Sequence, residues 1–293
     1  MTLAQLRYFC TAARYHSITQ AANILFVTQP TVSIAIRDLE REFSLTLFVH
    51  TNSGLTLTNE GEVFYDRASA ILSQCDDLTA EYGGSKPNQS RFSIGIPPML
   101  STIFFPELLD AFHQVYPDIW VELQEFGSVR ACQLVQNDVL DMGLVNMELH
   151  DIDKFHTLYL ATEPAYLGVC PSHPLAGERS ISLEQLQGQP LILFNQDSVQ
   201  NQIFLGQFQA RKITPHIIMR SSQIITILKF IRQGKCSCFF YRSMFEQLPE
   251  LVGIPLDPPV ETRVGLVWRR GRYMTAGMRA FLDFCKRRYK DHA

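Results

Sequence analysis

The chain has 293 residues, of which 46% are hydrophobic and 19% charged, with a formal net charge of −3. This length suggests two domains with buried cores, and the apolar content with the small net charge excludes an intrinsically disordered protein. No window reaches the ~18 uncharged apolar residues that a membrane helix requires. The N-terminus lacks the basic-then-apolar order of a secretory signal, so we expect a cytoplasmic protein. The seven cysteines, an odd number, indicate reduced thiols rather than a disulfide framework.

The first 58 residues contain three helical patterns in succession. Residues 2–5 and 17–20 are capping-box sequences, and apolar residues at helical spacing follow each of them. Residues 28–30, Thr-Gln-Pro, open a third helix, because proline is tolerated in a first turn. We expect this third helix to bury one stripe of side chains, formed by Val32, Ile36, Leu39 and Phe43.

Two short strand patterns, residues 45–49 and 55–57, then flank the turn sequence Asn52-Ser53-Gly54. Three helices followed by a hairpin are typical of a winged helix-turn-helix, in which the third helix enters the major groove of DNA. On periodicity alone, a small helical subdomain without a DNA role remains equally open.

The same stretch also carries a family resemblance that runs without a gap to about residue 65. Its marks are Leu6-Arg7-Tyr8-Phe9, residues 17–22 and 29–33, Leu39-Glu40, Leu47-Phe48 and Leu57-Thr58 with Gly61. Together they resemble the DNA-binding end of the LysR-type bacterial transcriptional regulators. The resemblance implies a sequence-specific regulator of double-stranded promoter DNA. The residues expected to face that DNA are Thr28, Gln29, Pro30, Thr31, Ser33, Ile34, Arg37 and Ser53.

The chain departs from the family pattern at positions that matter for DNA. Ile34 stands where many members have Arg or Lys, His50 replaces a usual Arg, and the wing residues 51–54 hold no cation. We therefore expect weak phosphate attraction, with base recognition resting on Gln29, Thr31, Ser33 and Arg37. Ile34 either touches a thymine methyl group or is simply an exposed apolar side chain.

Residues 59–82 form a proline-free helical pattern that ends at Gly83-Gly84. Apolar residues follow it at heptad spacing: Phe64, Ala68, Ile71, Cys75, Leu78 and Tyr82. Such a seam fits a helix that pairs with another helix, or an amphipathic helix packed on its own domain. The resemblance favours a homodimer, and a homotetramer is common in the family. We expect residues 59–90 to be a dimerisation helix and hinge.

From residue 91 onward, strand and helix patterns alternate, which predicts α/β layers with mainly parallel strands. We expect strands at 92–96, 120–124, 142–145, 165–170, 191–194 and 238–241, and helices at 102–116, 130–137, 200–211 and 222–233.

This region resembles, more loosely, the effector domain of the same family, at residues 94–96, 116–118, 173–176 and 265–270. The resemblance implies a two-lobed, periplasmic-binding-protein-like effector domain over 91–293, with lobe I at 91–162 and 266–293 and lobe II at 163–265. We expect a small polar or anionic effector between the lobes. By position its lining residues are Pro98, Met99, Leu100, Ser101, Thr102, Ser128, Gln196, Ser198 and Gln202.

Other classes of function fit the sequence less well. It holds no glycine-rich phosphate loop, serine nucleophile elbow or His-Glu-x-x-His motif, so we expect no enzyme, no catalytic residues and no cofactor. Cys236 and Cys238 are a weak zinc signal, and alternating core and surface positions on a strand explain them better than a metal site. A solute-binding protein without a DNA role is the alternative, but it would not carry the N-terminal helices.

Overall fold

The computed structural model describes residues 1–51, 54–82, 91–148, 151–272 and 274–289. These residues form two compact units, an N-terminal one up to residue 88 and a C-terminal one that holds nearly all of the rest. No helix within the described ranges is long and apolar enough to cross a membrane.

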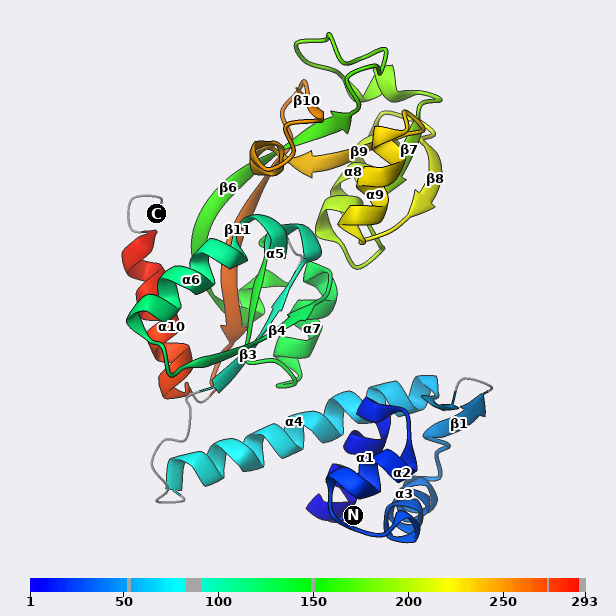
Figure 1. The fold of residues 1–293 in the computed structure, drawn as a ribbon, viewed down its shortest axis with the longest axis vertical. Coiled ribbons are helices and arrows are strands. Elements are labelled where there is room, and N and C mark those ends of the chain that lie inside the picture. The colour runs from blue at the N-terminus through cyan, green and yellow to red at the C-terminus, as the bar shows by residue number, and fades with distance from the viewer. Residues whose placement is uncertain (52–53, 83–90, 149–150, 273, 290–293) are drawn as a thin grey trace. The chain divides into compact units, whose positions relative to one another are not determined.

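The N-terminal unit consists of three short helices, a hairpin and a long helix (Figure 1). Its elements are α1 (Leu3–Tyr15), α2 (Ile18–Ile24), α3 (Gln29–Phe43), β1 (Phe48–Thr51), β2 (Gly54–Leu57) and α4 (Asn59–Tyr82). The two strands are antiparallel, with Phe48 opposite Leu57. The winged helix-turn-helix predicted from the sequence is confirmed.

Local hydrogen bonds explain the tight turns between these helices. The Thr2 hydroxyl accepts from the Gln5 N–H at 3.2 Å, and the Gln5 side chain accepts from the Thr2 N–H at 2.8 Å. The Ser17 hydroxyl accepts from the Gln20 N–H at 3.2 Å at the start of α2. Each bond satisfies a first-turn amide that has no partner within its helix.

A set of polar contacts joins the hairpin to α3 and α4. The Glu40 carboxylate accepts from the Leu47 N–H at 2.8 Å. The Thr58 hydroxyl donates to the Thr46 carbonyl at 2.6 Å and accepts from the Gly61 N–H at 2.8 Å. These contacts surround one core, formed by Leu6, Phe9, Ala12, Ala21, Ala22, Val32, Ile36, Leu39, Leu47, Leu55 and Ala68.

The C-terminal unit is built on a nine-stranded sheet, counted over the described residues, in the order β4-β3-β5-β11-β6-β9-β7-β8 with β10 paired to β6. Its strands are β3 (Arg91–Ile96), β4 (Trp120–Glu125), β5 (Met142–Asn146), β6 (Phe155–Val169), β7 (Pro190–Leu193), β8 (His216–Arg220), β9 (Ser237–Tyr241), β10 (Val252–Pro255) and β11 (Glu261–Arg269). Its helices are α5 (Pro98–Ile103), α6 (Phe105–Val115), α7 (Ser128–Gln136), α8 (Val199–Ala210), α9 (Ile224–Arg232) and α10 (Ala276–Arg288), with short 3₁₀ turns η1 (Ile152–Lys154), η2 (Leu183–Leu186) and η3 (Arg242–Glu246).

The long strand β6 joins the two parts of the sheet, and β11 lies beside its first half (Figure 1). β6 pairs with β11 along residues 155–164 and with β9 along residues 165–168. On one side β3 lies parallel to β4 and β5, and on the other β7 lies parallel to β8 and β9. The α/β class predicted from the sequence is therefore confirmed. The strands are not mainly parallel as predicted, because the pairings that involve β6 and β11 are antiparallel.

Several parts of this unit differ from the sequence prediction, which did not include β10, β11 or α10. The single helix expected at 102–116 was wrong, because α5 starts at Pro98 and Phe104 separates it from α6. The strand expected at 165–170 is the second half of β6. The first half of β6 was missed, because exposed polar residues interrupt its apolar pattern. The edge strand β8 was missed, because its half-exposed pattern is weak.

Candidate DNA-recognition face and effector site

The first turn of α3 presents a polar surface. Thr28, Gln29, Pro30 and Thr31 are all exposed. The Thr28 hydroxyl caps the helix by accepting from the Thr31 N–H at 3.4 Å, and the two hydroxyls lie 2.8 Å apart. Thr28 is thus part of the cap, which fixes the direction in which the Gln29 side chain leaves the helix.

One turn further along, Ser33, Ile34 and Arg37 continue this surface. An Arg37 guanidinium N–H donates to the Ser33 hydroxyl at 3.3 Å, so the two side chains form one unit. Ile34 is 55% exposed and is not part of the core. The other arginine of this helix, Arg41, forms an ion pair with Asp38 at 2.5 Å. Arg37 is therefore the α3 cation that is not held by an acid on its own helix.

Two predictions for this domain need qualification. The buried stripe of α3 holds Val32, Ile36 and Leu39, but Phe43 is exposed. The Phe43 and Phe64 rings pack edge to face, with their centroids 5.2 Å apart. Ser53, the predicted DNA contact in the wing, lies outside the described residues.

Phe26 is a surface residue that the sequence analysis did not single out. It lies between α2 and α3 with a φ of 55°. Its side chain is 95% exposed, in a unit whose other phenylalanines pack against the core or one another. The only sequence signal is an aromatic residue two positions before the Thr28 cap, which a search for buried stripes passes over.

In the C-terminal unit, Asp197 joins two of the segments predicted to line the effector site. Its carboxylate accepts from the Gly127 N–H at 2.7 Å, and its carbonyl accepts from the Val129 N–H at 3.1 Å. A Cβ atom on Gly127 would lie 2.4 Å from the Asp197 carboxyl carbon, so this approach requires glycine. Asp197 thus occupies the amide of Gly127 with its carboxylate and the amide of Val129 with its backbone carbonyl, at the start of α7.

Ser128 lies next to this contact in a buried polar chain. Its hydroxyl donates to the Asn146 side-chain oxygen at 3.2 Å and accepts from the Asn146 N–H at 3.1 Å. The Asn146 amide in turn donates to the Tyr241 hydroxyl. Burial raises the pKa of Tyr241 to about 12, so the phenol stays neutral.

The five residues predicted from the 98–102 segment separate into two groups. Met99 and Leu100 are buried in the core, where the Met99 sulfur accepts from the Tyr241 N–H at 3.4 Å. Leu100 is therefore a packing residue rather than a lining one, because the segment forms α5 and not a loop. The hydroxyls of Ser101 and Thr102 each donate to the Pro98 carbonyl at 2.9 Å.

The Ser101 hydroxyl also contacts the Glu125 carboxylate, which is exposed at the end of β4. In the facing segment, Gln196 and Gln202 are exposed, and the Ser198 hydroxyl caps α8 by accepting from the Asn201 N–H at 3.4 Å. The structure thus joins the segments at 127–129 and 197, and it commits several predicted hydroxyls to intramolecular bonds.

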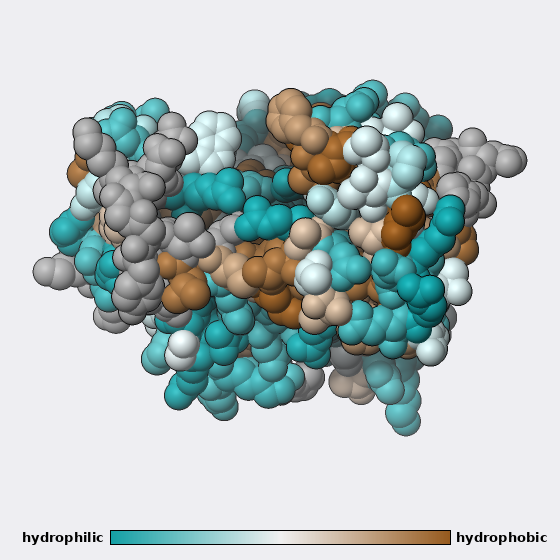
Figure 2. All heavy atoms as spheres, turned by 90° about the horizontal axis from the view of Figure 1, so that it is seen from below, coloured by the Kyte–Doolittle hydropathy of each residue, from teal (hydrophilic) through white to brown (hydrophobic). Residues whose placement is uncertain are grey.

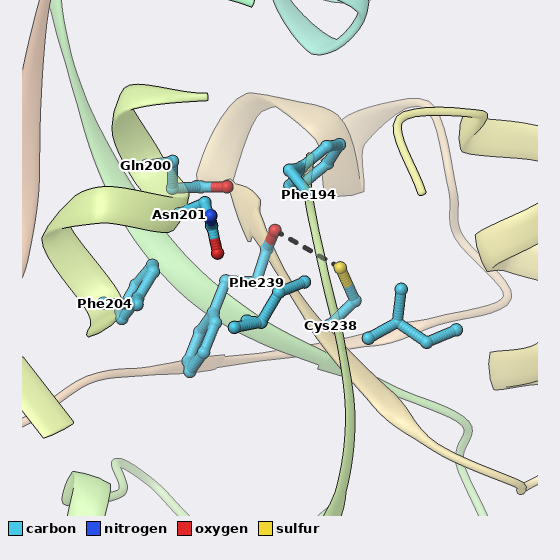
Figure 3. Close-up of a pocket in the computed structure, with 8 residues that line it drawn as sticks. Phe194, Gln200, Asn201, Phe204, Cys238 and Phe239 are labelled. Carbon is cyan, nitrogen blue, oxygen red and sulfur yellow. Dashed lines mark hydrogen bonds between the residues drawn. The ribbon is translucent and has the colours of Figure 1, made fainter. Parts of the chain in front are cut away.

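Gln200, in the first turn of α8, was missed by the sequence analysis. It is 3% exposed, and neither its side-chain nitrogen nor its oxygen has a hydrogen-bond partner. Its amide lies beside Phe194, Asn201 and Cys238 (Figure 3), where the side chains leave no room for a water molecule. Neighbouring Asn201 is satisfied, since it accepts from Arg220 at 3.0 Å. No sequence signal separates Gln200 from the other glutamines of this segment.

The cysteine pair at 236 and 238 has a structural explanation that differs from the predicted one. Every residue of β9 is buried, so the strand is covered on both faces and its positions do not alternate between core and surface. Burial raises the pKa of Cys236 to about 11 and that of Cys238 still further. Both thiols pack in the larger core.

The sequence matches two family models that cover almost all of it. Residues 3–62 match "Bacterial regulatory helix-turn-helix protein, lysR family", and residues 85–290 match "LysR substrate binding domain". The chain belongs to the LysR family. It is a DNA-binding transcriptional regulator with an effector-binding domain.

Relatives of this LysR-family regulator match along most of their length. The uncharacterized HTH-type transcriptional regulator YwbI of Bacillus subtilis is 32% identical over 98% of this chain and 96% of its own. The RuBisCO operon transcriptional regulator of Allochromatium vinosum is 28% identical over 97% of this chain and 95% of its own.

Solved structures share the fold at lower identity. The LysR family transcriptional regulator CbnR has a TM-score of 0.70 at 20% identity and covers 99% of this chain and 100% of its own. The effector binding domain of QuiR, in complex with shikimate, has a TM-score of 0.62 at 18% identity and covers 70% of this chain and 99% of its own.

Proposed function

We propose that the protein acts in the cytoplasm, where α3 enters the major groove of promoter DNA and reads bases through Gln29, Ser33 and Arg37. The observation that carries this is the bond between Arg37 and Ser33, which aims one unneutralised guanidinium from the exposed face of α3. An arginine held in this way suits the bidentate recognition of guanine. Ile34, exposed beside it, suits an apolar contact with a thymine methyl group.

Replacing Arg37 by alanine is expected to weaken specific binding by about 1–3 kcal/mol, roughly 10- to 100-fold, because a guanine contact is lost. Fluorescence anisotropy would compare a duplex from upstream of the protein's own gene with a scrambled duplex. The matched control is Arg41→Ala, whose guanidinium is already paired with Asp38. That control should weaken both duplexes slightly and equally. Equal weakening by Arg37→Ala would instead assign Arg37 to phosphate.

The same titrations, repeated over a range of salt, report how many phosphates are neutralised. Residues 1–58 contain four arginines and no lysine. Arg7 is expected to lie on α1 away from the groove, so at most about three cations per subunit can neutralise phosphates. The slope of log K against log salt should therefore be about −5 or shallower for a dimer. A slope near −10 would reveal a cationic surface elsewhere on the protein.

We propose that α4 pairs two copies into a homodimer, the unit from which a tetramer would form. Apolar side chains stand exposed among polar ones on the face in Figure 2. On α4 the large exposed apolar residues are Val63, Ile71 and Leu78. Their spacing of eight and seven residues keeps them within about one quarter of the helix circumference, which fits a helix-pairing seam.

We propose that the C-terminal unit acts as two lobes, 91–162 with 266–293 and 163–265, and that a small polar effector binds between them. The long strands β6 and β11 supply the two crossings. Asp197 and Glu125 already occupy the Gly127 amide and the Ser101 hydroxyl. Carboxylates at these positions disfavour an anionic group there and favour a ligand that brings hydroxyl donors.

We infer that Gln200 anchors such a ligand when the closed space around it in lobe II opens, because its buried amide lacks partners. Replacing it with leucine should raise the stability of the free protein by about 1 kcal/mol, since an unsatisfied buried polar group is removed. Thermal unfolding measures this change, and Gln209→Leu, an exposed glutamine of the same helix, is the matched control with no expected gain. A loss of stability in Gln200→Leu would mean that the amide is already satisfied.

Calorimetry with hydroxylated ligands tests the binding role directly. Neutral polyols are suitable first probes, and shikimate, the hydroxylated carboxylate with which the QuiR domain was solved, tests whether an anionic group is disfavoured. A ligand that binds the parent protein should bind Gln200→Leu at least tenfold more weakly and Gln209→Leu unchanged. A ligand that binds all three alike would place the effector elsewhere.

A further inference from the structure

A second pocket lies in the C-terminal unit, apart from the segments around Asp197 and Gln200. It has a volume of about 520 Å³, which is within the range of small-molecule sites. Residues from α5, α6, β6, η3 and α10 line it, so it touches both halves of the long sheet (Figure 1). None of the residues predicted to bind the effector lines it.

Glu163, from the middle of β6, is a buried member of this lining. It is 6% exposed. Its Oε1 accepts from the Ser243 hydroxyl at 2.6 Å, whereas Oε2 is buried without any hydrogen-bond partner. A buried carboxylate oxygen without a donor is costly, so this site lacks one N–H or O–H group.

The charged side chains around the pocket indicate that the missing hydrogen-bond donor is positively charged. Glu107 and Glu246 also line it, and among the described residues its only cation is Arg288, which hydrogen-bonds to Tyr289. Burial raises the pKa of Glu163, and hydrogen bonding by the hydroxyl and the backbone of Ser243 lowers it. The Glu246 carboxylate raises this pKa, whereas the Arg242 guanidinium lowers it by a smaller amount. A positively charged donor would both reduce the repulsion between the Glu163 and Glu246 carboxylates and donate a hydrogen bond to Oε2.

The rest of the lining favours an organic cation over a metal ion. Ile103 and Phe104 give the pocket an apolar wall. Within the described part of the chain, no group of three or more His, Cys, Asp or Glu side chains is placed to hold a metal ion. The volume also greatly exceeds that of a single ion.

We propose that this pocket binds a small aliphatic amine, whose ammonium group donates to Glu163 and whose alkyl chain lies against Ile103 and Phe104. Such a ligand contacts α5, α6 and α10 from one half of the unit and η3 from the other. The pocket is therefore a second regulatory site, independent of the effector site proposed above.

Calorimetry on the whole chain with n-butylammonium chloride, and with sodium butyrate as the matched anion, tests the proposal. We expect saturable binding of about one butylammonium per chain and no binding of butyrate. Glu163→Gln keeps an acceptor for Ser243 and should weaken the ammonium at least tenfold. Glu246→Gln, at an exposed position of the pocket, should weaken it several-fold and serves if Glu163→Gln does not fold.

The matched control is Glu178→Gln, an exposed glutamate outside the pocket, which should leave the affinity unchanged. Failure of the parent protein to bind butylammonium saturably at millimolar concentration would overturn the proposal. Equal affinities for butylammonium and butyrate, or equal binding to all the folded variants, would also overturn it.

Discussion

Replacing Gly61 by alanine is expected to lower the free energy of unfolding of the N-terminal unit by about 1–3 kcal/mol, and by more if the backbone cannot shift. A Cβ atom there would lie 2.1 Å from the Leu47 carbonyl oxygen and 3.1 Å from a Leu57 methyl carbon. That carbonyl is fixed, because it accepts from the Thr58 N–H at 3.1 Å. The added methyl group therefore separates α4 from the hairpin and disrupts the wing.

Thermal unfolding and DNA binding by anisotropy measure this effect. For a domain of this size, the melting temperature should fall by roughly 4–8 °C per kcal/mol, with loss of DNA affinity. Gly206→Ala is the matched control, since nothing lies within 4 Å of a Cβ atom on Gly206, in α8. There alanine should stabilise the helix by up to about 1 kcal/mol. Equal melting temperatures for the two variants would contradict the close approach at Gly61.

Replacing Ile71 by aspartate is expected to dissociate the dimer, at a cost of several kcal/mol per dimer. Ile71 is 38% exposed and Leu78 61% exposed in the single chain, so this part of α4 gains little from its own domain. Phe64 and Ala68, earlier on the helix, already pack on the core of the N-terminal unit. Pairing would thus depend on the later part of the predicted seam.

Light scattering coupled to size exclusion measures the oligomeric state, and circular dichroism checks that α4 remains helical. Ile71→Leu preserves an apolar side chain of the same size and should remain a dimer. An unchanged oligomer in a folded Ile71→Asp protein would show that α4 does not hold the subunits together.

The N-terminal unit was largely predictable because its signals are local. The caps at Thr2, Ser17 and Thr28 mark the helix starts, and each makes the expected hydrogen bond. Phe43 and Phe26 are the exceptions. Their exposure depends on where α4 and the turn before α3 come to lie, and neither is encoded in helical spacing.

The effector site was less predictable because it depends on contacts between distant segments. Position along the chain pointed to Ser128 and the segment around Ser198, but not to the bond between Gly127 and Asp197 across 70 residues. The glycine at position 127 can be interpreted as a requirement for close packing only once Asp197 is known to lie against it. Periodicity gave no indication that Leu100 belongs to the core or that the Gln200 amide is buried without partners.

Footprinting on the DNA upstream of the protein's own gene and its divergent neighbour tests sequence-specific binding through α3 most directly. A dimer that places two α3 helices in successive major grooves should protect two half-sites separated by one helical turn or a multiple of it. Arg37→Ala should lose this protection at protein concentrations where Arg41→Ala retains it. Protection that shows no preference for any promoter fragment would contradict the account.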